Sequence, residues 1–520
     1  MANRITIVGA GIGGLAAAMR LSAAGCDVAV IERHSAPGGK MRTVPSVAGP
    51  VDAGPTVMTM RPVFEELFQA CGTDLSTHIT LEPLDILARH YWPDGSSLDL
   101  FANWKRSEAA IHSFAGAQAA MEFARFHATA QRLYQAFEAP MMQAPSPTLA
   151  GLTATIARNP SLIPAMAPGR SLATSLAAQF TDPRLQQLFG RYATYVGGSP
   201  TASPALLSLI WHAESRGVWA VQGGMHKLAQ AMRTVAESHG ATFHFDTKIT
   251  EVETKSGNVT AIHTATVRLP TDAVVFNGDP RALQTGLLGH AVAKTISSKA
   301  VAPRSLSAFV WSFAATPTAL QPEHHNVFFA RSPNSEFAEI AENRLPTDPT
   351  LYVCAQDRGA GAQPTGPERF EIILNGPPRP GTQPDPQETI QCQKTTFETL
   401  ARMGLTFDET PPTTSLATPE TFNDLFPATN GSLYGRSPHG MMAAFHRPRA
   451  RTAIQGLYLC GGGAHPGAGI PMATLSGKHA AEAILQDLAS TSTSRRTATA
   501  GGMSTASRTM AATPSRSSPS

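Results

Sequence analysis

Two short apolar runs separated by a helical repeat open the chain. Residues 4–8 and 27–31 are rich in β-branched side chains and predict buried strands. Between them, the small and apolar residues of 15–24 predict a helix. A strand, a helix and a second strand in this order predict two parallel strands joined by a crossover helix.

The same kinds of pattern return twice, far along the chain. The first return predicts a helix and four strands, at 226–238, 242–245, 248–254, 259–263 and 273–276. The second predicts a strand at 456–460 and a helix at 473–488. We therefore predict one discontinuous α/β domain, built from residues 1–84, 221–284 and 451–489.

Two insertions separate the parts of this domain. Residues 85–220 are mostly helical in pattern, with apolar segments at 156–179 and 185–213. Residues 285–450 alternate strand-like runs with helices and predict an inserted mixed-sheet domain, whose strands could pair antiparallel. Its predicted strands, helix and exposed loop lie at 305–313, 326–330, 351–355 and 370–374, at 388–403 and at 376–386.

Composition narrows the class of protein. The 520 residues carry a formal net charge of +3, which does not favour nucleic acid as a partner. No uncharged apolar run is long enough to span a bilayer, and the N-terminus enters the first strand directly, without room for a signal peptide. No cysteine pair has metal-ligand spacing, so we expect no metal site and free thiols in a reducing compartment, at Cys26, Cys71, Cys354, Cys392 and Cys460.

The end of the chain differs in kind. Residues 490–520 consist largely of Ser, Thr and Ala, with no acidic residue and four arginines. Because such a composition cannot bury a core, we predict a disordered tail. It could be inert or make a weak electrostatic contact with anionic lipid.

The candidate chemistry begins in the glycine-rich turn at residues 9–14, Gly-Ala-Gly-Ile-Gly-Gly. Gly9 allows the tight turn out of the strand, Gly11 lets the backbone approach a pyrophosphate, and Gly14 lets the helix pack on the sheet. Glu32 ends the second strand, where a carboxylate can accept hydrogen bonds from ribose hydroxyls. Together these features predict a dinucleotide site; a ligand-free turn would leave Glu32 unexplained.

A second glycine cluster favours FAD over NAD. Residues 37–42 read Pro-Gly-Gly-Lys-Met-Arg and follow Glu32 closely, where a nicotinamide enzyme would continue into an ordinary crossover. The cluster resembles the glycine–glycine motif of the flavin amine oxidase and phytoene desaturase superfamily, in which Lys40 and Arg42 would supply positive charge to the phosphates of FAD. Arg33 leaves NADP open, because an arginine at that place can bind a 2′-phosphate.

Further motifs extend this resemblance to nearly the whole chain except the tail. They are residues 9–40, 52–56, 222–225 and 277–280, with Gly-Gly-Gly-Ala-His-Pro-Gly-Ala-Gly-Ile-Pro-Met at 461–472. The C-terminal motif looks like the signature of bacterial carotenoid desaturases. Residues 48–52, 188–200 and 206–219 are most similar to the branch that desaturates 1-hydroxy or 1-methoxy acyclic carotenoids between C3 and C4. Gly462, Ala464 and Met472 depart from the general signature.

The resemblance implies an architecture, a cofactor and a reaction. The fold would be a discontinuous Rossmann-like FAD-binding domain with an inserted mixed-sheet substrate domain and a helical, membrane-facing region at 85–220. The substrate would be an acyclic carotenoid that loses a hydride from an allylic carbon to the flavin and a proton from the neighbouring carbon. The implied FAD-binding residues are Gly9, Gly11, Gly13, Gly14, Glu32, Arg33, Gly39, Lys40, Arg42, Pro55, Thr56, Ile249, Gly463, Gly469, Ile470, Pro471 and Met472.

No strong general base emerges from the sequence. Glu214 and His212 follow the apolar stretch 206–211 and are candidates to take the proton or to bind the terminal hydroxyl. Glu214 could instead pair with Arg216 on the surface.

Other functions and locations stay open at this point. Alternatives are a phytoene desaturase, an amine or porphyrinogen oxidase, and a non-enzymatic prenyl-lipid carrier of the same fold. The final electron acceptor could be oxygen or a quinone. We expect a peripheral protein on the cytoplasmic side, in contact with a membrane lipid surface. The segments 156–179 and 185–213 could dip into that surface, line a substrate tunnel or be ordinary core helices.

Overall fold

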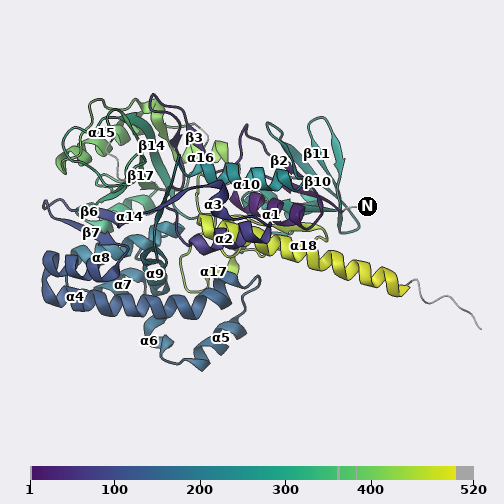
Figure 1. Cartoon of the computed structure of the whole chain (residues 1–520), viewed down its shortest axis with the longest axis horizontal. Coiled ribbons are helices and arrows are strands. Elements are labelled where there is room, and N and C mark those ends of the chain that lie inside the picture. Colours follow the sequence, from purple (N-terminus) through teal and green to yellow (C-terminus); the bar gives the residue numbers. More distant parts are fainter. Residues whose placement is uncertain (1–2, 360–363, 382, 499–520) are drawn as a thin grey trace, which may run out of the picture.

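A five-stranded parallel sheet joins three distant parts of the chain (Figure 1). The computed structural model describes residues 3–359, 364–381 and 383–498. The strand order of the sheet is β19-β13-β1-β2-β9, and each neighbouring pair is parallel. The strands are β1 (Arg4–Val8), β2 (Asp27–Ile31), β9 (Thr242–His244), β13 (Ala273–Phe276) and β19 (Leu457–Leu459).

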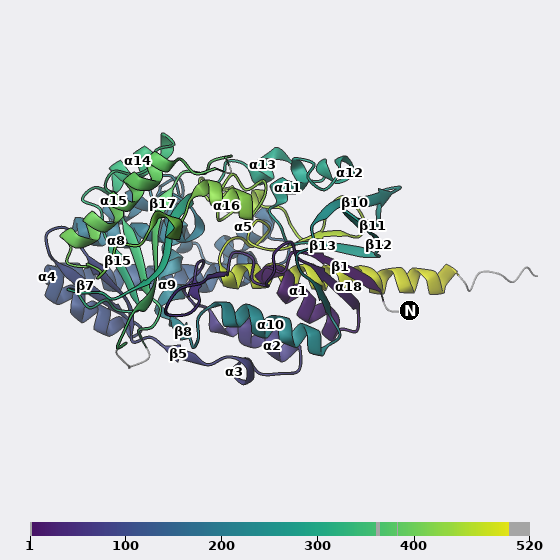
Figure 2. The ribbon, with the colours of Figure 1, turned by 90° about the horizontal axis from the view of Figure 1, so that it is seen from above.

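Each face of this sheet is covered by a different layer (Figure 2). Along β13, Ala273 and Val275 join the core beneath the helices, whereas Val274 and Phe276 join the core beneath an antiparallel meander. This alternation follows from the two-residue period of a strand. The helices are α1 (Ile12–Ala23), α2 (Arg61–Ala70), α3 (Leu75–His78), α10 (His226–Ser238) and α18 (Ile470–Ala498), and the meander is β10 (Ile249–Lys255), β11 (Asn258–Thr264) and β12 (Arg268–Pro270).

The second large sheet has seven strands in the order β18-β14-β17-β16-β15-β6-β7. All its pairs are antiparallel except β15 with β6, so the sheet is mixed. The strands are β6 (Ile86–Tyr91), β7 (Ser97–Phe101), β14 (Ser307–Ala315), β15 (His325–Phe328), β16 (Leu351–Ala355), β17 (Glu368–Gly376) and β18 (Leu416–Ala417). Helices of the same segment are α14 (Pro333–Ala341), α15 (Pro386–Arg402), α16 (Pro419–Leu425) and α17 (Ala443–His446), with the 3-10 turn η4 (Thr413–Ser415).

A helical layer adjoins the seven-stranded sheet. Its long helix α4 runs across the lower part of the molecule in Figure 1, above α5 and α6. Its aromatic core includes Phe123, Phe126, Phe189 and Trp211, all buried. The elements are α4 (Trp104–Phe137, interrupted at Gly116), η1 (Glu138–Gln143), α5 (Leu149–Arg158), α6 (Leu162–Met166), α7 (Leu172–Ala177), α8 (Pro183–Gly190), η2 (Arg191–Val196), η3 (Ala205–Ser208) and α9 (Leu209–Ser215). Short connecting elements are β3 (Thr43–Val44), β4 (Val51–Asp52), β5 (Leu81–Pro83), β8 (Trp219–Val221), α11 (Pro280–Gln284), α12 (His290–Ala293) and α13 (Ser298–Val301).

The region predicted to be mostly helical, 85–220, begins with two strands at 86–91 and 97–101, and most of the remainder is helical. The two strands form the β6–β7 hairpin, which completes the edge of the seven-stranded sheet. The turn signal is present in the sequence as Pro93-Asp94-Gly95, where Gly95 has a φ of 81° and Asp94 accepts a hydrogen bond from the Ser96 N–H. The hairpin therefore belongs to the sheet of the later insertion.

The two long apolar segments are broken into short helices. Residues 156–179 are divided among α5, α6 and α7, and residues 185–213 among α8, two 3-10 turns and α9. New helices begin at side-chain caps, since Thr148, Ser171 and Asp182 each accept a backbone hydrogen bond from the first turn. Pro160 follows the end of α5, and Pro168 and Gly169 follow the end of α6, so neither of these helices continues.

Helix α18 extends into the segment whose composition predicts disorder. It continues through residue 498 and extends away from the body of the molecule (Figure 1). A helix that is already nucleated adds one hydrogen bond for each further residue, so it can continue through a sequence of poor helix formers. The rest of the expected tail, residues 499–520, lies outside the described residues. Among the helices of the described part, none is long and apolar enough to cross a membrane.

We predict that one buried carboxyl group makes the stability of the fold depend on pH. Glu336 of α14 is 2% exposed, and burial raises the pKa of its carboxyl from 4.5 to about 7, although Asn375 and Thr350 donate hydrogen bonds to it. The folded state therefore retains a proton that the unfolded chain loses, and the free energy of unfolding should fall as pH rises from about 4.5 to about 7.

The measurement is denaturant unfolding at several pH values for the wild type and Glu336→Gln. The wild type should lose up to about 3 kcal/mol across this interval relative to the variant, which cannot titrate at this position. Glu342→Gln, at an exposed position after the same helix, is the control. Parallel pH curves for the wild type and Glu336→Gln would contradict the prediction.

Candidate cofactor and active site

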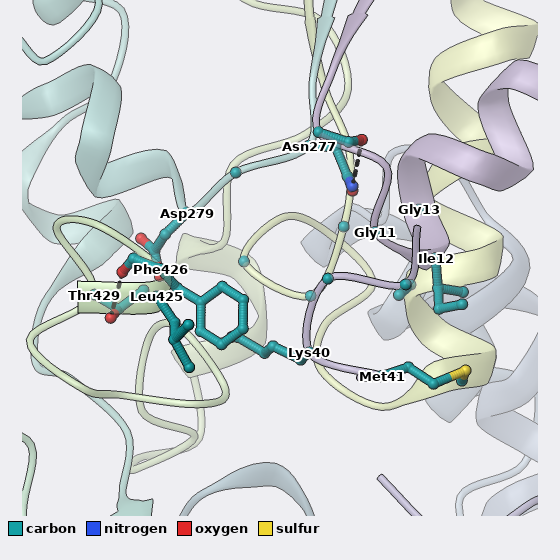
Figure 3. A pocket seen from close by; sticks show the side chains of 18 of the residues that line it. Gly11, Ile12, Gly13, Lys40, Met41, Asn277, Asp279, Leu425, Phe426 and Thr429 are labelled. Carbon is teal, nitrogen blue, oxygen red and sulfur yellow. Dashed lines mark hydrogen bonds between the residues drawn. The ribbon is translucent and has the colours of Figure 1, made fainter. Parts of the chain in front are cut away.

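A cavity of about 480 Å³ lies between the two large sheets. One wall is formed by the β1–α1 turn, the second glycine cluster and the 461–473 turn, and the opposite wall by Val310, Glu371 and Ile373 of the seven-stranded sheet. Residues 422–434 close a third side. Figure 3 shows Phe426 and Leu425 of this segment pointing toward Lys40 and the glycine turn.

Close backbone packing shapes the β1–α1 turn. Gly9 has a φ of 98°, a left-handed conformation that favours glycine. A side chain at Gly14 would collide with the Gly9 carbonyl, and one at Gly13 would come within 2.7 Å of the Gly461 nitrogen. Gly11 is the N-cap residue of helix α1 and offers no side-chain acceptor. The first N–H groups of the helix therefore lack side-chain acceptors beside the cavity.

Glu32 connects the β1–α1 turn to the end of β2. Its carboxylate accepts hydrogen bonds from the backbone N–H of Ala10 at 2.7 Å and of His34 at 2.9 Å, and the side chain lines the cavity although it is 4% exposed. A carboxylate has about four lone-pair sites, so capacity remains for the hydroxyls of a ligand. The expected ribose-binding position is therefore structurally intact.

Lys40 brings a positive charge to the cavity. Its Nζ donates to the Leu433 carbonyl at 2.6 Å and lies 5.7 Å from the centre of the Phe426 ring. Burial lowers the pKa of Lys40 to about 8, while the nearby Asp279 carboxylate opposes that shift. Arg304 pairs with Asp279 at 2.5 Å, and Arg447 donates to the Gly462 and Tyr434 carbonyls. The cavity therefore has a positively charged wall, which suits a ligand with phosphate groups.

Most of the predicted FAD-binding residues line the cavity. They are Gly9, Gly11, Gly13, Glu32, Arg33, Gly39, Lys40, Ile249, Pro55, Gly463, Gly469 and Ile470. The other five are not part of its lining. Gly14 packs beneath the turn, Thr56 donates to or accepts from the Tyr352 hydroxyl at 2.8 Å, and Arg42 lies 6.0 Å from the Phe422 ring. Pro471 and Met472 lie in the first turn of α18, and Met472 packs against the main core.

These observations fit FAD. Adding a Cβ at Gly11 would bring it within 2.9 Å of the Asn277 Nδ2 atom, so the glycine turn approaches its neighbours more closely than a larger residue allows. Both α1 and α18 begin at residues that line the cavity, and the positive end of a helix dipole favours anionic groups. The glycine turn, Glu32 and Lys40 would hold the nucleotide half of FAD, and the wall from Pro55 to the sheet would face its ring system.

Glu214 and His212 lie in α9 and do not line the described cavity. Glu214 is 4% exposed, so it does not form the surface pair with Arg216 that the sequence left open. Burial raises the pKa of Glu214, and the Arg191 guanidinium opposes this shift. Burial lowers the pKa of His212 to about 4, so its ring is neutral at neutral pH.

Asn277 and Glu371 line the cavity but were not predicted as site residues, although Asn277 lies in the motif at 277–280. Asn277 donates through Nδ2 to the Gly9 carbonyl at 3.0 Å, and its Oδ1 accepts from the Cys460 thiol, so it connects the ends of three parallel strands. Its place directly after a predicted strand was an available signal. Glu371 of β17 is fully buried in the lining, and its position in a strand of the second insertion gave no hint of contact with the cofactor domain.

The seven-stranded sheet also brings together His324, His325 and Cys354, whose potential ligand atoms lie within 4.8 Å of one another. Sequence spacing did not reveal this group because its members lie at β15 and on β16, which pair across the sheet. The Nδ1 atom of His324 bonds to the Arg358 carbonyl, and that of His325 bonds to the Tyr352 hydroxyl. These contacts account for one nitrogen of each ring, and we assign no metal to the group.

The fold and cavity are those of a dinucleotide-binding oxidoreductase with an inserted mixed sheet. An oxidoreductase from Methanosarcina mazei has the same fold, with a TM-score of 0.61 and 15% identity, over 92% of this chain and 100% of that one. The family described as flavin containing amine oxidoreductase matches residues 12–485. The chain belongs to this family, and its cofactor is FAD.

Two relatives are similar over nearly their whole length. The hydroxyneurosporene desaturase of Cereibacter sphaeroides is 52% identical, over 94% of this chain and 99% of the relative. The hydroxyneurosporene desaturase of Rhodobacter capsulatus is 51% identical, over 93% of this chain and 98% of the relative.

Proposed function

We propose that the protein is an FAD-dependent carotenoid desaturase that introduces a C3–C4 double bond into 1-hydroxy or 1-methoxy acyclic carotenoids. The observation that carries this proposal is the full-length similarity to the hydroxyneurosporene desaturases. The cavity supports it, because the lining on the side of the inserted sheet is largely apolar and includes Val310, Ile373 and Leu433. A hydrocarbon chain gains free energy when it leaves water for such a surface.

The reaction removes one hydrogen from C3 and one from C4 of the substrate. Bound FAD supplies the two-electron oxidation. The apolar wall of β14 and β17 holds the polyene and excludes water, while the 422–434 segment covers the cavity. Because C4 is allylic to the existing polyene, positive charge that develops there is delocalised without a charged protein group.

The direct test is a product analysis with purified protein supplied with FAD and lipid. We expect 1-hydroxyneurosporene to be converted to a product whose absorption is shifted to longer wavelength, because the new double bond extends the conjugated system, and phytoene to remain unchanged. Gly14→Val, whose side chain would collide with the Gly9 carbonyl, is the control expected to lack flavin. Consumption of phytoene instead would move the protein to an earlier desaturation.

We also propose that Glu214 is a positioning residue that acts through Arg191. The Arg191 guanidinium acts electrostatically on the Glu214 carboxyl group, and it lies 4.9 Å from the Tyr195 ring and 5.7 Å from the Tyr352 ring. The Tyr352 hydroxyl in turn bonds to Thr56, which follows the cavity residue Pro55. A neutral residue at position 214 would leave the half-buried Arg191 without this nearby opposite charge and free to move.

Glu214→Gln should lower kcat by about 10-fold, with KM and flavin content nearly unchanged, because the change acts on orientation rather than on binding. Steady-state kinetics normalised to bound flavin checks this, and Glu214→Asp should restore part of kcat. Glu122→Gln removes another buried carboxylate of the helical layer, which accepts from Thr181, and is the control. Wild-type kcat in Glu214→Gln would refute the role.

We further propose that the protein attaches peripherally to a membrane through an apolar rim formed by Leu149, Ile163, Met441 and Met442. These side chains are 40–53% exposed, and the Met441 sulfur accepts from the Gly169 N–H, which brings both segments together. Helices α5 and α6 project from the body at this place (Figure 1). Residues 139–181 contain no Asp or Glu, so the phosphates of lipid headgroups meet no acidic residue of this segment.

Replacing Leu149, Ile163 and Met441 together by Ser should weaken binding to vesicles of phosphatidylcholine and phosphatidylglycerol by about 10- to 100-fold, since less apolar area enters the bilayer. Co-sedimentation measures this. Val267→Ser is the matched control, because Val267 is 50% exposed beside β12, outside the helical layer. Equal sedimentation of the triple variant and the control would exclude this surface.

A further inference from the structure

Glu371 stands apart from the other carboxyl groups of the cavity. Three acidic residues line it, and two of them have partners: Glu32 accepts from backbone N–H groups and Asp279 pairs with Arg304. Glu371 is 0% exposed, and among the described residues neither of its oxygens has a hydrogen-bond partner. Leaving a buried polar group without a hydrogen-bond partner is unfavourable, so its presence in the wall indicates a ligand atom that pairs with it.

The strand geometry fixes where this carboxyl group points. Phe370 and Ile372, its neighbours on β17, belong to the core on the outer face of the seven-stranded sheet. Glu371 and Ile373 lie on the other face and line the cavity. Arg42 is close enough to act electrostatically on Glu371, but no hydrogen bond or ion pair joins them.

The surroundings of Glu371 favour the neutral form of its carboxyl group over the ionised form. Burial raises the pKa of Glu371 well above its usual value, and the nearby Asp52 carboxylate raises it further, while Arg42 opposes both effects. A protonated carboxyl group has one O–H donor and retains an acceptor oxygen. It can therefore bond to a hydroxyl group in either direction and can also donate to an ether oxygen, which only accepts.

The chemistry of the substrate supplies one matching atom near the reacting carbons. A 1-hydroxy or 1-methoxy carotenoid is a hydrocarbon apart from the oxygen on C1, and C1 is two bonds from C3. That oxygen must therefore lie within roughly 4 Å of the bond that becomes desaturated. Only a group in the cavity wall can reach it, and Glu371 is a hydrogen-bonding group on the sheet side of that wall.

We propose that Glu371 recognises the oxygen on C1 of the substrate and so makes the enzyme selective for oxygenated over purely hydrocarbon carotenoids. This inference rests on the proposed function. It assigns to a single residue of the inserted sheet the discrimination between substrates that differ by one oxygen atom. A site that hydrogen-bonds a polar group rejects the analogue without that group, because its own buried polar atom is then left unpaired.

The test compares wild type, Glu371→Gln and Glu371→Leu on three probes: 1-hydroxyneurosporene, its methyl ether and neurosporene, which lacks the oxygen. Dissociation constants are measured by quenching of tryptophan fluorescence and kcat/KM by product analysis. Glu371→Leu should weaken binding of both oxygenated probes by about 10- to 100-fold and leave that of neurosporene unchanged or tighter. Glu371→Gln should retain most of the selectivity, since its amide still donates.

The matched control is Glu336→Gln, which alters a buried glutamic acid of the same inserted domain that is not in the cavity lining. It should leave the selectivity unchanged. An equal loss of affinity for all three probes in Glu371→Leu, or a loss of bound flavin, would overturn the proposal and assign Glu371 to folding or to the cofactor. If the wild type binds the oxygenated probes selectively but does not desaturate them, the proposed function fails and the role of Glu371 in recognition stands.

Discussion

The site depends on the close approach of three backbone segments at the ends of β1, β13 and β19. Asn277 holds them together: its backbone N–H bonds to the Val8 carbonyl, its side chain donates to Gly9, and Cys460 donates to it. Glycines at positions 9, 13, 14 and 461 make this approach possible, because a Cβ at 13 or 14 would overlap a neighbouring backbone atom. The turn that receives the nucleotide is therefore built by segments more than 400 residues apart.

Charge in the cavity is divided between its two walls. Lys40 and Asp279 of the cofactor domain lie near Arg304 and Arg447 of the second insertion. Most donors of these three cations are already engaged by backbone carbonyls or by the Asp279 carboxylate. The wall from the inserted sheet is apolar except for Glu371. Such a division suits two ligands that bind side by side, one with charged groups and one that is mainly hydrocarbon. On the sheet side an ionised carboxylate would have no counter-charge in hydrogen-bond contact. This is why the surroundings of Glu371 favour its neutral form.

The insertions give the fold its particular chemistry. The seven-stranded sheet takes strands from both insertions, since the β6–β7 hairpin pairs with β15. The helical layer carries Arg191 and Glu214 to the side of Tyr352, so residues of three different segments meet behind Thr56. The same layer projects α5 and α6 on its outer side (Figure 1). One compact layer thus connects an exposed apolar surface with the polar network beside the cavity.

The sequence by itself determined the cofactor domain. Strands at 4–8, 27–31 and 273–276 and the helix at 226–238 have the predicted bounds, because local apolar periods and glycine turns specify them without help from distant contacts. Twelve of the FAD-binding residues that the family resemblance implied line the cavity. Only the tertiary structure decided which sheet the β6–β7 hairpin joins, where the helices of 149–215 break, and that Glu371 faces the cofactor domain. These features arise from pairing between segments far apart in sequence, and a strand pattern does not reveal what its inner face will meet.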